Sequence, residues 1–88
     1  MKEEFQNYLI AKGYSQYTRS GKPSTVYDYC KRIDHVCAWE HLDWFELKHQ
    51  ISAILPQYEQ GGEKSELGSK SHGSVRAALK CFWLFSNE

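Results

Sequence analysis

Hydroxyl and cationic side chains gather at two places in the sequence, and both are predicted starts of helices. Lys22, Ser24 and Thr25 mark the first place, and the segment Lys70–Lys80 contains the second. The first N–H groups of a helix have no partner within it and carry a partial positive charge, so they attract phosphate. Ser, Thr, Lys and Arg side chains commonly contact phosphate oxygens as well. These residues therefore favour the binding of a polyanion such as DNA.

The candidate DNA-contacting residues are polar or cationic and lie near these two helix starts or on the polar faces that follow. They are Lys22, Ser24, Thr25, Lys31, Arg32, Lys70, Ser71, His72, Ser74, Arg76 and Lys80. With about five phosphates neutralised, log K would fall with log salt concentration at a slope near −4 to −5.

Arg76 is the candidate for reading a base, because it is expected on the exposed side of the last helix and a guanidinium can fork onto guanine. We therefore expect the double substitution Arg76→Ala plus Lys80→Ala to weaken duplex binding. The same substitution is expected to leave the melting temperature nearly unchanged.

Each candidate also has a purely structural interpretation. The serine and threonine hydroxyls commonly cap helices, with or without a ligand. Lys31 and Arg32 could belong to a solvated helix face, with pairing to Asp28, and this explanation has equal weight. Arg76 and Lys80 have no acidic neighbour in the sequence, which favours contact with DNA for these two residues.

The charges are unevenly distributed along a chain that is neutral overall, with 11 basic and 11 acidic residues. Residues 12–32 hold five basic residues against one acid, and residues 34–66 hold seven acids against two lysines. Residues 67–87 hold three basic residues and no acid. Such segregation can build a basic and an acidic face on a neutral molecule. Chance clustering on a solvated surface explains it equally well.

Four segments repeat apolar residues at helical spacing, and none reads as a strand. Helices are predicted over about residues 3–12, 24–39, 43–56 and 71–85, and Asp43 with Glu46 has the spacing of a capping box. Pro56 should kink or end the third helix, leaving residues 57–60 as a loose turn at most. Residues 60–70, with three glycines, are predicted to form an exposed, mobile loop. These four helices predict a compact all-α four-helix bundle, with residues 1–88 as one domain.

The composition argues against several classes of protein. There is no run of about 18 apolar residues that would span a membrane, and the N-terminus lacks the apolar stretch of a signal peptide. The three cysteines are interpreted as reduced thiols in a cytoplasmic protein. Cys37 and His41 could share a metal ion, but the second ligand pair of a structural zinc site is missing. No nucleophile–base pair, glycine-rich phosphate loop or carboxylate pair points to catalysis, and no cofactor is expected.

Three signatures, in order along the chain, resemble the core-binding (SAM-like) domain of phage integrases, which are tyrosine recombinases. Phe5–Leu9 reads FQNYL and is followed by GYS at residues 13–15. Ser24–Tyr29 reads STVYDY. Lys70–Lys80 reads KSHGSVRAALK and is followed by FWLF. The order and spacing of the three signatures over nearly the whole chain give the resemblance its weight.

The resemblance implies a SAM-like bundle that, with a separate catalytic domain, closes as a C-shaped clamp around double-stranded DNA. The N-termini of the second and fourth helices would approach the backbone and the major groove. The implied partners are duplex DNA, the protein's own catalytic domain and other protomers on DNA, with a monomer off DNA in a bacterial or phage-encoded protein. The family's catalytic His-x-x-Arg is not found, since His72 and Arg76 are one residue too far apart. This chain alone is therefore not expected to be an enzyme.

The alternative function is a small helical module that binds other proteins. The acidic stretch from Asp34 to Glu66 could meet a basic partner. Trp39, Trp44 and Trp83 would then be candidate anchors, because tryptophan is enriched at the energetic centres of interfaces. Core packing is the better explanation for Trp44, whereas Trp39 and Trp83 fit either role.

Overall fold

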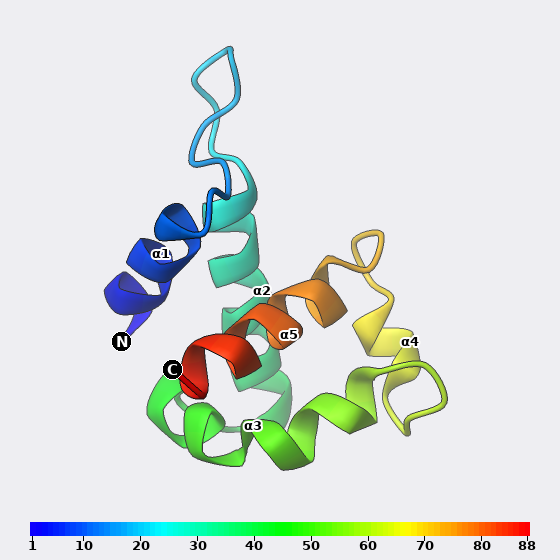
Figure 1. Cartoon of the computed structure of the whole chain (residues 1–88). Coiled ribbons are helices and arrows are strands. Elements are labelled where there is room, and N and C mark those ends of the chain that lie inside the picture. The colour runs from blue at the N-terminus through cyan, green and yellow to red at the C-terminus, as the bar shows by residue number, and fades with distance from the viewer.

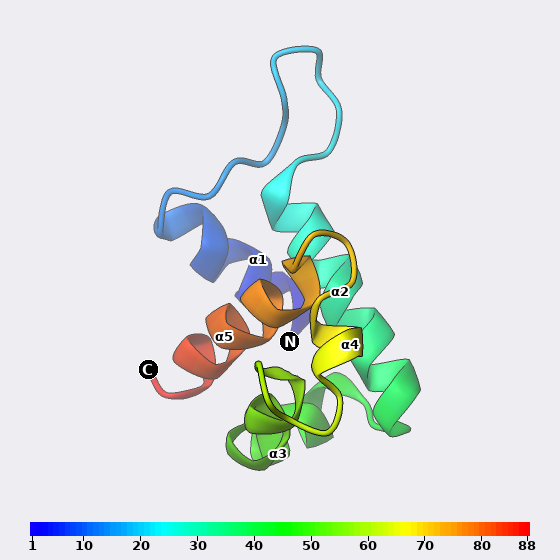
Figure 2. The same cartoon turned by 90° about the vertical axis from the view of Figure 1, so that its right-hand side faces the viewer.

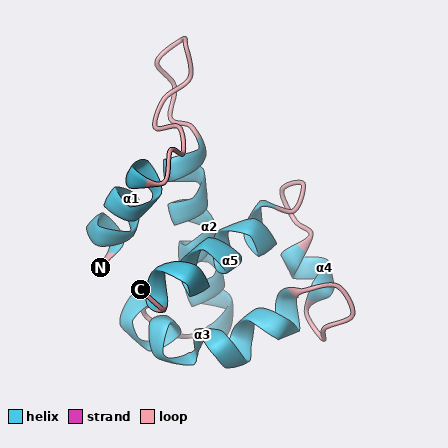
Figure 3. Ribbon diagram, in the orientation of Figure 1, coloured by secondary structure: helices cyan, strands magenta, loops and turns pink.

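The computed structural model describes all 88 residues and contains five helices and no strand (Figures 1 and 3). The helices are α1 (Lys2–Ala11), α2 (Thr25–Glu40), α3 (Trp44–Tyr58), α4 (Ser65–Gly68) and α5 (Ser74–Ser86). The Cα radius of gyration is 12.5 Å, close to the roughly 12 Å expected for a compact domain of this length. The predicted all-α class is confirmed, whereas the count of four helices is wrong because α4 adds a single turn.

One hydrophobic core holds the four longer helices together, and it consists of 17 buried residues. At its centre the rings of Phe5 and Phe82 meet edge to face, with centroids 5.2 Å apart. Trp44 packs against Phe82 in the same manner at 5.5 Å, so this tryptophan contributes to the core as expected. Helix α5 contacts both α2 and α3 (Figure 1). The three free cysteines are all buried among the helices.

The start of α3 has the capping box that the sequence predicts. The Asp43 side chain accepts a hydrogen bond from the Glu46 N–H at 2.7 Å, and the Glu46 side chain accepts one from the Asp43 N–H at 3.1 Å. At the other end the helix continues past Pro56 and stops at Tyr58. Proline removes a hydrogen bond to the preceding turn, and the helix ends two residues later.

The segment predicted as an exposed, mobile loop is instead packed against the end of α3. Gly68, the last residue of α4, is buried, and Lys64, Ser65 and Leu67 are half-buried. The predicted exposure is confirmed for six of the residues 60–70 and is wrong at Gly68 and its half-buried neighbours. The glycine at position 68 serves close packing, since a Cβ there would lie 2.0 Å from the Tyr58 carbonyl oxygen.

The connection between α1 and α2 forms a hairpin that projects from the helical body (Figures 1 and 2). Its two arms are joined by an isolated bridge between Tyr17 and Pro23. In both views the hairpin and the N-terminus of α2 lie at one end of the molecule, and α3 lies at the opposite end. No helix of this chain combines the length and the apolar character needed to cross a bilayer.

Candidate nucleic-acid interface

The N-terminal end of α2 offers free backbone donors beside hydroxyl side chains. Ser24 is the N-cap residue, and its side chain makes no cap hydrogen bond. The Val26 N–H donates to the Ser15 carbonyl oxygen at 3.0 Å, whereas the N–H groups of Thr25 and Tyr27 have no backbone acceptor. An anion at this end of α2 can therefore accept hydrogen bonds from both backbone and hydroxyl groups.

Two lysines flank this end of α2, and neither forms an ion pair. Lys22 precedes the helix, and both it and Lys31 are exposed. Lys31 follows Ser24 by seven residues, which places the two side chains on one face of the helix about two turns apart. Ser24, Thr25 and Lys31 therefore follow one another along the start and N-terminal half of α2, and Lys22 lies in the segment that leads into it.

Arg32 is engaged within the protein. Its Nη2 lies 2.9 Å from Asp28 Oδ1 and its Nε lies 3.3 Å from the same oxygen. Its Nη1 lies 3.4 Å from the Nδ1 of His35, and the arginine side chain is only 17% exposed. The pairing with Asp28 is thus the interpretation that the structure supports for Arg32.

Helix α5 begins at Ser74, three residues later than predicted. The φ angles of Ser71 and His72 are 55° and 58°, and Gly73 follows at 83°. Three successive residues in the left-handed region cannot belong to a right-handed helix, so Gly73 and not a serine is the N-cap. Ser71 and His72 remain exposed in the loop before α5, and Ser74 is half-buried.

Lys70 belongs to the same loop and rests on a tryptophan of α2. Its Nζ lies 5.6 Å from the centroid of the Trp39 ring, within the range of a cation–π contact. The residue itself is exposed. Lys70, Ser71 and His72 therefore form a second polar group, separate from the one at the start of α2.

Arg76 does not lie free on the exposed side of α5, so the expectation that it reads a base loses its geometric basis. Its Nε donates to the Tyr58 carbonyl oxygen at 3.0 Å, and its Nη2 donates to the Ser65 carbonyl oxygen at 3.1 Å. A third hydrogen bond joins Nη2 to Ser69 Oγ at 3.2 Å. The guanidinium thus joins α5 to the ends of α3 and α4, and its removal would destabilise the fold.

Lys80 is exposed, but it faces a different side of the molecule from the α2 N-terminus. It lines a hollow of about 380 Å³ together with Trp83 of α5 and residues of α3, among them Leu55 and Glu59. The structure does not bring Lys80 together with the polar group on α2. Trp83 is half-buried in this hollow.

A partly buried cluster of titratable groups, which sequence reasoning missed, joins α2 to the segment around α4. The Glu40 Oε2 atom accepts hydrogen bonds from the Tyr58 hydroxyl, at 2.7 Å, and from the Lys64 ammonium. Partial burial alone would raise the pKa of Glu40, but these two donors outweigh it and the pKa is lowered from 4.5. Burial and the bond to Glu40 raise the pKa of Tyr58. The cluster is a structural contact in which the Glu40 carboxylate is ionised and the Tyr58 hydroxyl is protonated at neutral pH.

This lowered pKa predicts a specific dependence of stability on pH. Glu40 is more acidic in the folded chain than in the unfolded chain, so its contribution is complete above the unfolded pKa and is lost as pH falls through the folded pKa. Glu40→Gln should therefore cost about 1–2 kcal/mol at pH 7, and this difference should shrink below pH 4.5. Thermal melts of both proteins between pH 7 and pH 3 measure it.

Glu3→Gln provides the matched control, because Glu3 is exposed and forms no ion pair. Its stability difference from the parent protein should be small at every pH. A Glu40→Gln difference that stays constant down to pH 3 would contradict the role assigned to the Glu40 carboxylate.

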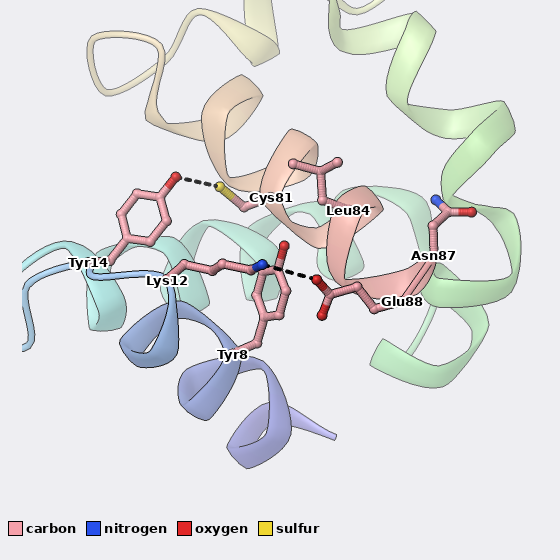
Figure 4. A pocket seen from close by; sticks show the side chains of 7 residues that line it. All are labelled: Tyr8, Lys12, Tyr14, Cys81, Leu84, Asn87 and Glu88. Carbon is pink, nitrogen blue, oxygen red and sulfur yellow. Dashed lines mark hydrogen bonds and ion pairs between the residues drawn. The ribbon is translucent and has the colours of Figure 1, made fainter.

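A cavity of about 430 Å³ opens between α1 and α5 (Figure 4). Its lining residues are Tyr8, Lys12, Tyr14, Cys81, Leu84, Asn87 and Glu88. The Tyr14 hydroxyl lies 3.4 Å from Cys81 Sγ, and this hydrogen bond together with partial burial raises the pKa of Tyr14 to about 12. Lys12 Nζ pairs with Glu88 Oε1 at 3.2 Å. Tyr14 is therefore protonated at neutral pH and cannot serve as a base there.

The cysteines and histidines do not gather into a metal-binding arrangement. Burial raises the pKa of Cys37 to about 11, and His41 is exposed at the end of α2. No group of three or more His, Cys, Asp or Glu side chains lies where it could hold one ion.

Comparison with known proteins found no match: no family model, no curated protein and no solved structure is significantly similar to this chain.

Proposed function

We propose that this chain binds duplex DNA as the SAM-like core-binding domain of a tyrosine recombinase. One observation carries the proposal: Lys22 precedes the free N–H and hydroxyl groups at the start of α2, Lys31 follows them about two turns later, and both lysines are exposed and form no ion pair. The order of the sequence signatures and the all-helical fold support the assignment to this family. Phosphate binding at a helix N-terminus supplies the mechanism.

The electrostatics of the two ends of the molecule favour DNA as the partner. Residues 13–27, which form the hairpin and the first turn of α2, contain cations and no acid. The unpaired acids between the end of α3 and the end of α4 are Glu59, Glu63 and Glu66. At the α3 end these acids are accompanied by the exposed cations Lys70 and Lys80. A polyanion is thus attracted more strongly to the hairpin end, where no acid opposes the cations.

The expected salt dependence is weaker than the sequence alone suggested, because Arg32 and Arg76 are occupied within the protein. The exposed cations without ion pairs around α2 and the loop before α5 are Arg19, Lys22, Lys31 and Lys70. Four neutralised phosphates correspond to a slope of log K against log salt of about −3.6.

A matched pair of substitutions tests the proposal. Lys31→Gln should weaken binding to a generic duplex by roughly 2- to 5-fold at low salt and make the slope less negative by about 0.9. Lys80→Gln removes the same charge from an exposed lysine that faces α3, and it should leave the slope unchanged. Fluorescence anisotropy at several salt concentrations measures both quantities.

Backbone amide shifts of the labelled protein, titrated with the same duplex, locate the contact. Salt-sensitive shifts at Lys22–Thr25 and at Lys70–Ser74 support the proposal, and the absence of any shift at low salt would contradict it.

The alternative function, a module that binds proteins, draws on the opposite end of the molecule. Phe45 is 62% exposed on α3, and the hollow between α3 and α5 is lined by Trp83. If the duplex produces no shift, this end of the molecule becomes the surface on which to search for a basic protein partner.

A further inference from the structure

The outer part of the hairpin between α1 and α2 contributes nothing to the core. Every residue from Tyr17 to Pro23 is exposed, and the hairpin rises well clear of the helices (Figures 1 and 2). Each arm, about four residues long, reaches roughly 13 Å at the usual rise of an extended strand. The tip of the hairpin is therefore free to contact a ligand.

Internal hydrogen bonds give the tip of the hairpin a defined shape. The Thr18 N–H donates to the Lys22 carbonyl oxygen at 2.8 Å, and the Gly21 N–H donates to the Thr18 carbonyl oxygen at 2.9 Å. The Lys22 N–H also donates to Thr18 Oγ1, which lies 3.0 Å from Ser20 Oγ. A preformed tip loses less conformational entropy when it binds than a disordered one would.

Contacts at its base fix the hairpin to α2. The Ser24 N–H donates to the Gln16 carbonyl oxygen at 2.8 Å. The rings of Tyr17 and Tyr27 lie 5.7 Å apart, with their hydroxyls separated by 3.4 Å. Tyr14 packs against Tyr29 at a similar distance. The direction of the hairpin is therefore set by the same helix end that presents the free N–H groups.

The chemistry of the tip fits phosphate. The five residues Thr18–Lys22 supply two hydroxyls and the cations Arg19 and Lys22, with no apolar side chain and no acid. Neither cation forms an ion pair. A protein partner would need apolar anchors at the centre of the contact, which this tip lacks, whereas a nucleic-acid backbone needs only cations and hydroxyls.

We propose that the hairpin Tyr14–Pro23 is an arm that binds the phosphate backbone of the duplex beyond the segment contacted by α2. This inference rests on the proposed function and adds a contact that the resemblance to recombinases does not include. The arm extends the bound surface by roughly 13 Å, which is about four nucleotides along one strand. Its cations act through charge, so the contact is independent of base sequence.

Shortening the arm tests the proposal without disturbing the core. Thr18–Lys22 is replaced by Asn-Gly, which favours a tight two-residue turn and keeps the paired residues Tyr17 and Pro23. The melting temperature should stay nearly unchanged, because the removed side chains pack against nothing. Affinity for a generic duplex should fall on the order of tenfold at low salt, and the slope should become less negative by about 1.8.

A second variant separates charge from length. Arg19→Gln keeps the length of the hairpin and removes one cation, so it should produce about half of the change in slope that shortening produces. Arg19→Lys keeps the cation and should therefore have the slope of the parent protein. Lys22, which the shortened protein also loses, belongs to the site at the start of α2, so Arg19→Gln is the variant that isolates the arm. An unaltered slope in the Arg19→Gln protein would overturn the arm while leaving the proposed function standing. A parent protein without any salt-dependent duplex binding would overturn the proposed function together with the arm.

Discussion

Replacing Gly68 by alanine is expected to lower the free energy of unfolding by about 3 kcal/mol or more, because the new methyl group has no room. A Cβ at this position would lie 2.0 Å from the carbonyl oxygen of Tyr58 and 3.0 Å from the carbonyl carbon. Both are backbone atoms at the end of α3, so neither can rotate away as a flexible side chain would. Urea denaturation followed by circular dichroism measures the loss.

Gly61→Ala is the matched control, since it adds the same methyl group in the same segment at a position with no close neighbour. Gly61 has a φ of +85°, and no atom lies within 4 Å of the position that its new methyl group would take. Its substitution should therefore cost only the strain of a left-handed alanine, about 1–2 kcal/mol. Equal losses at the two glycines would contradict the close approach of Gly68 to α3.

Arg76→Ala is expected to destabilise the protein by about 2–3 kcal/mol, because three hydrogen bonds from a charged donor are lost. Two backbone carbonyl oxygens, those of Tyr58 and Ser65, lose this donor. For a domain of this size the loss corresponds to a melting temperature lower by roughly 10–20 °C. Differential scanning calorimetry measures it directly.

Two further variants at α5 identify the cause of that loss. Arg76→Lys keeps the charge but cannot reproduce the fork of donors, so it should recover only part of the stability. Lys80→Ala removes an exposed cation one turn further along and should stay within about 0.5 kcal/mol of the parent protein. An Arg76→Ala protein as stable as Lys80→Ala would contradict the bridging role of the guanidinium.

The sequence predicts the elements whose signals are local. The apolar spacing of α2 and the Asp43–Glu46 capping box act within a few residues, and both are found in the structure. Helix α4 has only four residues and takes its place from contacts with Glu40, Tyr58 and Arg76. Such contacts join positions that are far apart in the sequence, so periodicity cannot indicate them.

In the candidate site, too, the sequence indicates local contacts and does not indicate contacts between distant positions. Counting charges treats Lys31 and Arg32 alike, yet only Arg32 reaches Asp28, one helical turn away. Arg76 has no acid near it in the sequence, but its partners are carbonyl oxygens 11 and 18 residues away. Backbone acceptors carry no sequence signature. A cation can therefore be assigned to a surface only when its position in the folded chain is known.

The separation of charge between the hairpin and α3 gives a neutral molecule a dipole moment. The hairpin tip holds Arg19 and Lys22, and the segment that follows the last residue of α3 holds the unpaired acids Glu59 and Glu63. A molecule without net charge feels little pull toward a distant polyanion, but the field turns it once it comes within about one Debye length, near 8 Å at physiological salt. Rotation would thus precede contact, so that the molecule arrives with the hairpin leading. Raising the ionic strength would shorten the distance over which this alignment can act.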